Sequence, residues 1–333
     1  MFKKLTTAWA LHQKQVALVL LVLAIAFPQV IKDTYILSVG VMCGIYVILA
    51  LGLNLITGYM GIVSIGHAAF FGIGAYTAAL LALNFKWNFL ITFVAAAVMS
   101  AIFGFILGLP TLRLSNRYLP IVTLSFCEIC RIVEMNEREI TRGPLGLPGI
   151  PGFSLFGVRL NNKVACYYLV LIFCLIAIYV VHSIMNSRTG RVITAIKNDE
   201  IAAESMGINL SRYKLLIFSV SSVFAGLAGA FYAHYVGFID PTSFSADQSI
   251  QILSMIIMGG MGNIYGSILG AVSLTVLPEM LRSLLSLRQV IYGALLVVMV
   301  LLRPQGLLGG FNLKHIKQQH DFNVEHEEEV EQA

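Results

Sequence analysis

The sequence predicts an all-α polytopic integral membrane protein with about 8–10 transmembrane helices. The first observation is composition: 58% of the 333 residues are hydrophobic and only 12% are charged. The second is a mean hydropathy of +0.83. A soluble globular domain carries about 25% charged residues. This chain therefore has too little polar surface to be covered by water, and its solvent must be largely lipid.

The third observation is a series of apolar stretches, each near the length of a bilayer-spanning helix or somewhat shorter. Most of the loops between them are short, which favours one transmembrane domain over residues 1–320 instead of two soluble domains. The stretches lie at about 16–31, 35–56, 66–84, 89–109, 118–133, 164–185, 215–237, 249–261, 264–285 and 289–302.

The first apolar stretch also has features of a signal peptide. Lys3 and Lys4 precede it, and Ala24-Ile25-Ala26 resembles a cleavage site. We interpret it as an uncleaved span, because the leader before the apolar run is long. Both termini also lie on the same side of the membrane only if this span is counted among the ten.

Basic residues predict the orientation of the chain. With the N-terminus inside, more than half of the 22 lysines and arginines lie in segments that face the cytoplasm. Lys and Arg in short loops set the orientation of membrane proteins. We therefore expect both termini to be cytoplasmic.

Two loops are longer than the others, and the C-terminal end is acidic. Segment 134–163 contains three prolines and five glycines, so it cannot be regular helix, and we place it on the outer face. Segment 186–214 is polar and able to form helix, and we place it on the cytoplasmic face. Residues 321–333, "DFNVEHEEEVEQA", are expected to be a disordered cytoplasmic tail.

The run "GYMGIVSIGHAAFFGIGAY" from Gly58 to Tyr76 combines glycines with a histidine. It does not match a phosphate-binding loop, since no lysine in the chain follows a glycine and Thr77 takes the last position of an incomplete G-x-G-x-x-G. Ser64 and His67 are three residues apart, but the run holds no acid that could orient the imidazole. We therefore expect no nucleotide, no other cofactor, no metal and no catalytic residue.

The same run lies between two spans, where glycine and serine allow a helix break that lines a cavity. Its polar groups would face a pathway or bond the backbone groups that the break sets free. Whether His67 is a packed structural histidine or lines the pathway is left open by the sequence. The candidate residues are Asn54, Gly58, Gly61, Ser64, Gly66 and His67.

Segment 186–214 contains a short predicted helix from Asp199 to Ser205, with small residues on one flank and carboxylates on the other. Gly207 could end it with a left-handed cap. The segment is either an ordinary solvated loop or a docking helix that presses into a groove on a soluble partner.

Glycines also recur at a spacing that suits helix packing. Gly262, Gly266 and Gly270 are four residues apart. Small residues at this spacing let transmembrane backbones touch, where lipid supplies no hydrophobic driving force. We expect these three glycines to lie in a helix–helix contact.

Four blocks of the chain resemble the bacterial branched-chain amino acid ABC transporter permeases, in particular the LivM type. Together they cover most of residues 44–310. In order, the blocks are "LALGLNLITGYMGIVSIGHAAFFGIGAYTAALL", "TRGPLGLPGIP", "RTGRVITAIKNDEIAAESMGINLSRYKLLIFSVSSVFAGLAGAFYA" and "MIIMGGMGNIYGSILGA".

The resemblance implies the ABC importer permease fold and a non-catalytic subunit in the bacterial inner membrane. A homologous permease would complete the pathway, two cytoplasmic ATPases would bind ATP, and a periplasmic amino-acid-binding protein would deliver leucine, isoleucine or valine. Membrane lipid would surround the helices, and no nucleic acid is expected.

The family's ATPase-coupling loop carries over onto residues 188–214. The wider importer class has E-A-A-x-x-x-G here, whereas Ile201 stands in place of the glutamate. That departure blurs which carboxylate matters, and Asp199, Glu200 and Glu204 are the expected ones. The implied coupling residues are Arg188, Arg191, Asp199, Glu200, Ala202, Ala203, Glu204 and Gly207.

Two other functions remain open. A permease of a urea or short-amide ABC importer shares most of the four blocks, and selectivity in such systems rests largely with the binding protein. An ion-coupled secondary transporter would need ion-binding residues in broken helices. The run from Gly58 to Tyr76 is a broken-helix candidate, but the spans show no aspartate cluster and no clear repeat.

Overall fold

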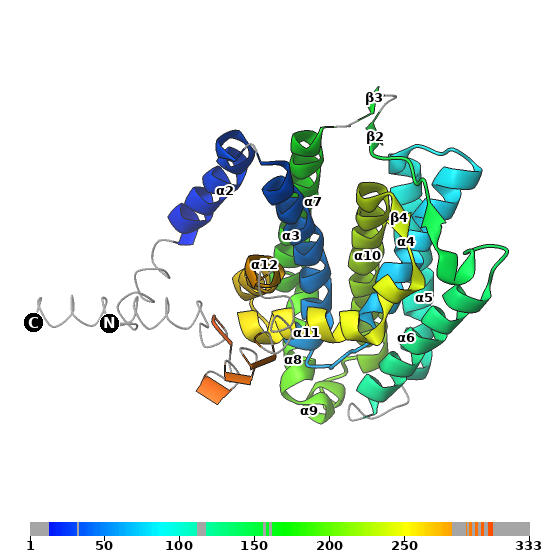
Figure 1. The fold of residues 1–333 in the computed structure, drawn as a ribbon. Coiled ribbons are helices and arrows are strands. Elements are labelled where there is room, and N and C mark those ends of the chain that lie inside the picture. The colour runs from blue at the N-terminus through cyan, green and yellow to red at the C-terminus, as the bar shows by residue number, and fades with distance from the viewer. Residues whose placement is uncertain are drawn as a thin grey trace, which may run out of the picture.

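A computed structural model describes residues 13–31, 33–111, 118–155, 158–159 and 162–281, together with 291, 293–294, 297–298, 301–302 and 306–308. The described residues form a bundle of helices with a few two-residue strands (Figure 1). The predicted all-α membrane fold is confirmed. The acidic tail predicted at 321–333 lies outside the described residues.

Five helical segments are long and apolar enough to cross a membrane, counted over the described residues. Helix α3 (Thr34–Leu53) continues without a gap into the π-helix η1 (Asn54–Tyr59). The other four are α4 (His67–Asn84), α5 (Phe89–Thr111), α7 (Lys163–Asn186) and α10 (Leu210–Val236).

Four further helices are shorter or less apolar than these five. They are α2 (Gln13–Val30), α6 (Leu119–Asn136), α11 (Ala246–Gly259) and α12 (Ile264–Met280). Nine of the ten predicted apolar stretches thus correspond to a described helix, and most of 289–302 lies outside the described residues. The prediction of about 8–10 spans stays a prediction.

The two long loops lie at opposite ends of the bundle (Figure 1). The first three residues of the segment predicted to be loop, 134–136, belong to α6, which continues to Asn136. Beyond it the chain forms the short helix η2 (Gly143–Leu145) and three strands. Strand β1 (Leu147–Pro148) pairs antiparallel with β4 (Phe238–Ile239), and β2 (Ser154–Leu155) pairs with β3 (Val158–Arg159).

The other long loop folds into two helices, α8 (Arg188–Asn198) and α9 (Glu200–Ser205). Figure 1 shows them at the end of the bundle where α7 ends and α10 begins. Helix α11 crosses the upright helices α3 and α10 in the same view, and it follows the short helix η3 (Pro241–Phe244).

Helix α10 is central, because it packs against α3, α4 and α5. Glycines bring these backbones into contact. A Cβ added at Gly74 on α4 would lie 2.2 Å from the carbonyl oxygen of Gly226 on α10, and one at Gly229 would lie 2.1 Å from the carbonyl oxygen of Phe71. No larger residue fits at these positions without separating the helices.

The glycine series at 262–270 serves two purposes. A Cβ at Gly270 would lie 1.9 Å from the carbonyl oxygen of Met255, and one at Gly266 would lie 2.6 Å from that of Gly259. These two glycines therefore lie in the contact between α11 and α12. Gly262 has φ +80° and belongs to the turn that joins those helices.

Replacing Gly74 with alanine is expected to destabilise the α4–α10 contact by about 1–3 kcal/mol, because overpacking forces a tightly packed core apart. Thermal unfolding of the purified protein in detergent measures the effect as a lower melting temperature.

The matched control is Gly152→Ala. A Cβ at Gly152 would meet nothing within 4 Å, so its melting temperature should equal that of the unchanged protein. Equal melting temperatures for the two variants would show that the α4–α10 backbone contact is not as tight as the structure indicates.

Candidate functional site

The chain breaks between α3 and α4. The last turn of α3 widens into the π-helix η1, in which the N–H of Met60 donates to the carbonyl of Leu55 at 3.2 Å. Residues 60–66 are not helical, and α4 begins at His67. Gly61 adopts φ +80° in this stretch, a conformation that favours glycine. The break is thus built from the run that the sequence singled out.

Side chains of neighbouring helices satisfy the backbone groups that the break sets free. The N–H of Ile65 donates to the hydroxyl of Thr123 on α6 at 3.0 Å. The N–H of Ala68 donates to the hydroxyl of Ser249 on α11 at 2.9 Å. Both donors are thus paired within the chain, as buried backbone groups must be.

A second break lies between α11 and α12, at Gly260–Asn263, and Asn54 joins it to the first. The side-chain oxygen of Asn54 accepts from the N–H of Gly262 at 2.9 Å, and its amide nitrogen donates to the carbonyl of Asn263 at 3.3 Å. Gly58 makes room for this arrangement, because a Cβ there would lie 1.8 Å from the Asn54 oxygen and 2.4 Å from the Gly262 nitrogen.

Lys197, in the last turn of α8, also reaches the first break. Its ammonium donates to the carbonyl oxygen of Gly58 at 2.6 Å. Burial lowers the pKa of Lys197 from the ordinary lysine value. No pattern in the sequence indicates a role for Lys197, since a lysine in a polar loop is ordinary until the fold brings it to a helix end.

His67 is 1% exposed and packs against α3. Its ring lies beside Gly52, where an added Cβ would be 3.3 Å from Nε2. That Nε2 has no hydrogen-bond partner among the described residues. Ser64 and Gly66 are buried as well, whereas Gly61 is exposed. In this conformation His67 is packed between the break and α3.

The α8–α9 segment contains the predicted coupling residues. The Asp199 carboxylate caps α9 by accepting from the N–H groups of Ile201 and Ala202 at 2.9 and 3.0 Å. Gly207 follows α9 with φ +80°, and its N–H donates to the carbonyl of Glu204 at 2.9 Å. The helix has both ends that the sequence predicted.

The exposed face of α9 is apolar as well as charged. Ile201 is 79% exposed and Met206 is 83% exposed, whereas Ala203 is buried against the bundle. Glu200 is engaged within the chain, in a 2.8 Å ion pair with Lys214 on α10. Exposed positions among the other predicted residues are Arg188, Arg191, Asp199, Ala202, Glu204 and Gly207.

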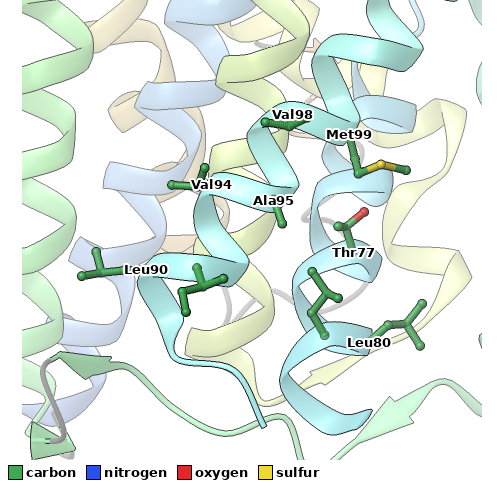
Figure 2. Close-up of a pocket in the computed structure, with 9 residues that line it drawn as sticks. Thr77, Leu80, Leu90, Val94, Ala95, Val98 and Met99 are labelled. Carbon is green, nitrogen blue, oxygen red and sulfur yellow. The ribbon is translucent and has the colours of Figure 1, made fainter. Parts of the chain in front are cut away.

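An apolar groove of about 870 Å³ lies between α4 and α5 (Figure 2). Its one polar side chain, Thr77, donates its hydroxyl to the carbonyl of Ile73 at 2.6 Å. The groove therefore offers a charged ligand no partner and suits lipid chains or a neighbouring helix. Its lining residues are Thr77, Leu80, Leu81, Leu90, Ile91, Val94, Ala95, Val98 and Met99.

No cluster of three or more His, Cys, Asp or Glu side chains that could hold a metal occurs among the described residues. All five cysteines are free, and four of them are buried. Their placement is that of small apolar side chains.

Comparison with known proteins shows the family of this chain. Residues 35–300 match the family model for the permease component of the branched-chain amino acid transport system. The chain belongs to this permease family. No solved structure matches the chain significantly.

Several curated permeases are similar to this one. The high-affinity branched-chain amino acid transport system permease protein LivM of Salmonella typhimurium is 37% identical, over 89% of this chain and 75% of that protein. LivM of Escherichia coli is also 37% identical over the same shares. The permease protein LivH of Salmonella typhimurium is 26% identical, over 79% of this chain and 91% of LivH. These relatives are permease subunits and not enzymes.

In this permease, Asn54→Leu is expected to lower the free energy of unfolding by about 1–3 kcal/mol, because the half-buried N–H of Gly262 loses its partner, whereas the carbonyl of Asn263 keeps its bonds from Ser267. Thermal unfolding in detergent measures the change.

Thr57→Val is the matched control on the same π-helix. The Thr57 hydroxyl is buried and has no hydrogen-bond partner in the described part of the chain. Its removal should leave the melting temperature unchanged or raise it. If Asn54→Leu were equally harmless, the link between the two breaks would not contribute to stability.

Proposed function

We propose that this chain is the transmembrane permease subunit of an ATP-driven importer for branched-chain amino acids. The observation that carries the proposal is the family match over residues 35–300, together with relatives that are named high-affinity branched-chain amino acid permeases. The subunit lowers the membrane barrier for leucine, isoleucine and valine, and no bond in the substrate changes.

A homologous permease is the expected membrane partner. Relatives named LivM and LivH both resemble this chain, which supports a pair of related permeases in one transport system. The side chains of Asn54, Ser64 and His67 at the first break are buried within this chain. A zwitterionic amino acid can therefore pass only if helices move, or if the pathway runs between two permeases.

Charge supports an orientation in the bacterial inner membrane. The α8–α9 end carries Arg188, Arg191, Lys197, Arg212 and Lys214. Lys and Arg next to spans favour the cytoplasmic side. Both termini and the α8–α9 segment are then cytoplasmic, and the loop with β1, β2 and β3 faces the periplasm, where it would meet an amino-acid-binding protein.

The α8–α9 segment is the expected docking site for two cytoplasmic ATPases, which bind the ATP that this chain has no loop to hold. Exposed apolar side chains at the tip of a polar segment are typical anchors in a protein interface. Ile201 and Met206 have this character. The carboxylate of Glu200 instead holds α9 on α10 through Lys214, which leaves Glu204 as an exposed acid on α9.

Alternating access explains how these parts act together. The binding protein delivers an amino acid at the periplasmic end, and ATP binding closes the two ATPases. The coupling segment then moves, and the helices next to the two breaks change their arrangement.

Ile201→Asp combined with Met206→Asp is expected to reduce co-purification of the ATPase subunits at least about tenfold, because an interface anchor typically contributes 2 kcal/mol or more. The measurement is the ratio of ATPase to permease after affinity purification from membranes. Leu145→Asp is the control, since Leu145 is 81% exposed at the other end of the bundle. Unchanged ratios in the double variant would contradict docking at α9.

Uptake by the complete complex in proteoliposomes tests the function itself. Labelled leucine should enter with ATP inside and the binding protein outside, and it should not enter with ADP, because the driving force is ATP hydrolysis. Leucine uptake without any ATPase subunit would instead favour an ion-coupled secondary transporter.

Substrate class is tested in the same vesicles. Excess isoleucine and valine should compete with leucine, whereas urea and acetamide should not. Competition by urea, or a melting temperature of the cognate binding protein that rises with urea and not with leucine, would show that the importer carries amides.

A further inference from the structure

Lys197 lies where three separate parts of the chain meet. It belongs to α8, its ammonium donates to Gly58 at the end of η1, and its Nζ lies 3.7 Å from the position that a Cβ on Gly262 would take. Gly58 and Gly262 belong to the two helix breaks. A single side chain of the α8–α9 segment thus bonds the first break and ends near the second.

Close packing fixes this meeting point. A Cβ at Gly262 would lie 3.1 Å from the carbonyl oxygen of Gly58, and one at Gly61 would lie 3.1 Å from Cγ of Lys197. Lys197 is otherwise exposed, so its stem passes over these two glycines and its ammonium ends at Gly58. A displacement of α8 therefore moves Gly58, or breaks the hydrogen bond.

The bond itself is favourable because of helix geometry. The last carbonyls of a helix have no intrahelical partner, and the helix dipole places partial negative charge there. An ammonium at this end is a charge-assisted donor, which forms a stronger bond than a neutral group. Among the described residues Lys197 forms no salt bridge, so this carbonyl is the bond partner that the structure gives it.

Helix α8 is also held firmly enough to transmit a displacement. Ile193 and Ile196 are buried against the bundle, and a Cβ at Gly190 would lie 2.2 Å from the carbonyl oxygen of Met185 on α7. The next helix, α9, is tied to α10 through the ion pair of Glu200 and Lys214.

We propose that Lys197 is a positioning residue that joins the coupling segment to both helix breaks, so that movement of α8 and α9 moves the breaks together. The inference rests on the proposed function, because it assigns a route by which ATPase movement reaches the pathway. Lys197 touches neither ATP nor the substrate in this scheme. It acts through the Gly58 carbonyl and, through Asn54, on Gly262.

Three variants of the complete importer in proteoliposomes test the proposal. Lys197→Met keeps the length of the side chain and removes the charge and the donors. Lys197→Arg keeps both. Lys163→Met is the matched control. Lys163 on α7 also donates to a backbone carbonyl, that of Thr34 at 3.2 Å, but at the end of α3 that lies opposite to η1.

The readout is leucine taken up per ATP hydrolysed, measured alongside ATPase co-purification. For Lys197→Met this ratio should fall about tenfold while the ATPases stay bound and hydrolyse ATP, as expected when a hydrogen bond to a charged group is lost. Lys197→Arg and Lys163→Met should both keep the ratio of the unchanged complex.

An unchanged ratio in Lys197→Met would overturn the proposal, even if uptake and hydrolysis fell in parallel. Loss of assembly in that variant would overturn it as well, because Lys197 would then be a folding residue. A ratio that fell equally in Lys163→Met would do the same. If the unchanged complex showed no ATP-dependent leucine uptake, the proposed function would fail, which is a separate result.

Discussion

Backbone groups that leave a helix inside lipid must find partners within the protein, and the arrangement of this permease depends on that constraint. The break after η1 sets free the N–H groups of Ile65 and Ala68, which Thr123 and Ser249 accept. The carbonyl of Gly58 accepts a hydrogen bond from the ammonium of Lys197. Helices α6, α8 and α11 must therefore converge on one short segment. Ser249 lies in the first turn of α11, so this helix begins beside the first break and then crosses α3 and α10 (Figure 1).

Glycine makes the convergence sterically feasible. Where Gly74 meets Gly226 the backbones of α4 and α10 are in contact, and where Gly58 meets Gly262 the two breaks are in contact. The first contact is a rigid packing surface between long helices. The second joins two irregular segments through Asn54. Glycine thus allows both the contact between the long helices α4 and α10 and the contact between the two breaks. Only the second contact also depends on hydrogen bonds from a side chain, that of Asn54.

The sequence predicted where the break and α9 lie in the chain better than it predicted which residues they contact. Spacing and composition placed the first break within 58–76, and they placed a short helix from Asp199 to Ser205 with a glycine cap at Gly207, whereas the capping role of Asp199 appears only in the structure. The prediction for the carboxylates was less complete. Glu200 is held by Lys214, and the exposed face of α9 presents Ile201 and Met206. A residue pattern shows which side chains are polar, but it does not show which of them the fold has already paired.

By itself, the sequence determined the membrane class, the helices, the break in the chain and the family, because low charge, apolar stretches and local glycine and capping signals act over a few residues. Tertiary structure decided that Asn54 bonds Gly262, 208 residues away, that His67 is packed against α3, and that Lys197 reaches Gly58. These contacts depend on how the helices pack. No local pattern encodes them, since each partner is an ordinary backbone group until the fold brings the two together.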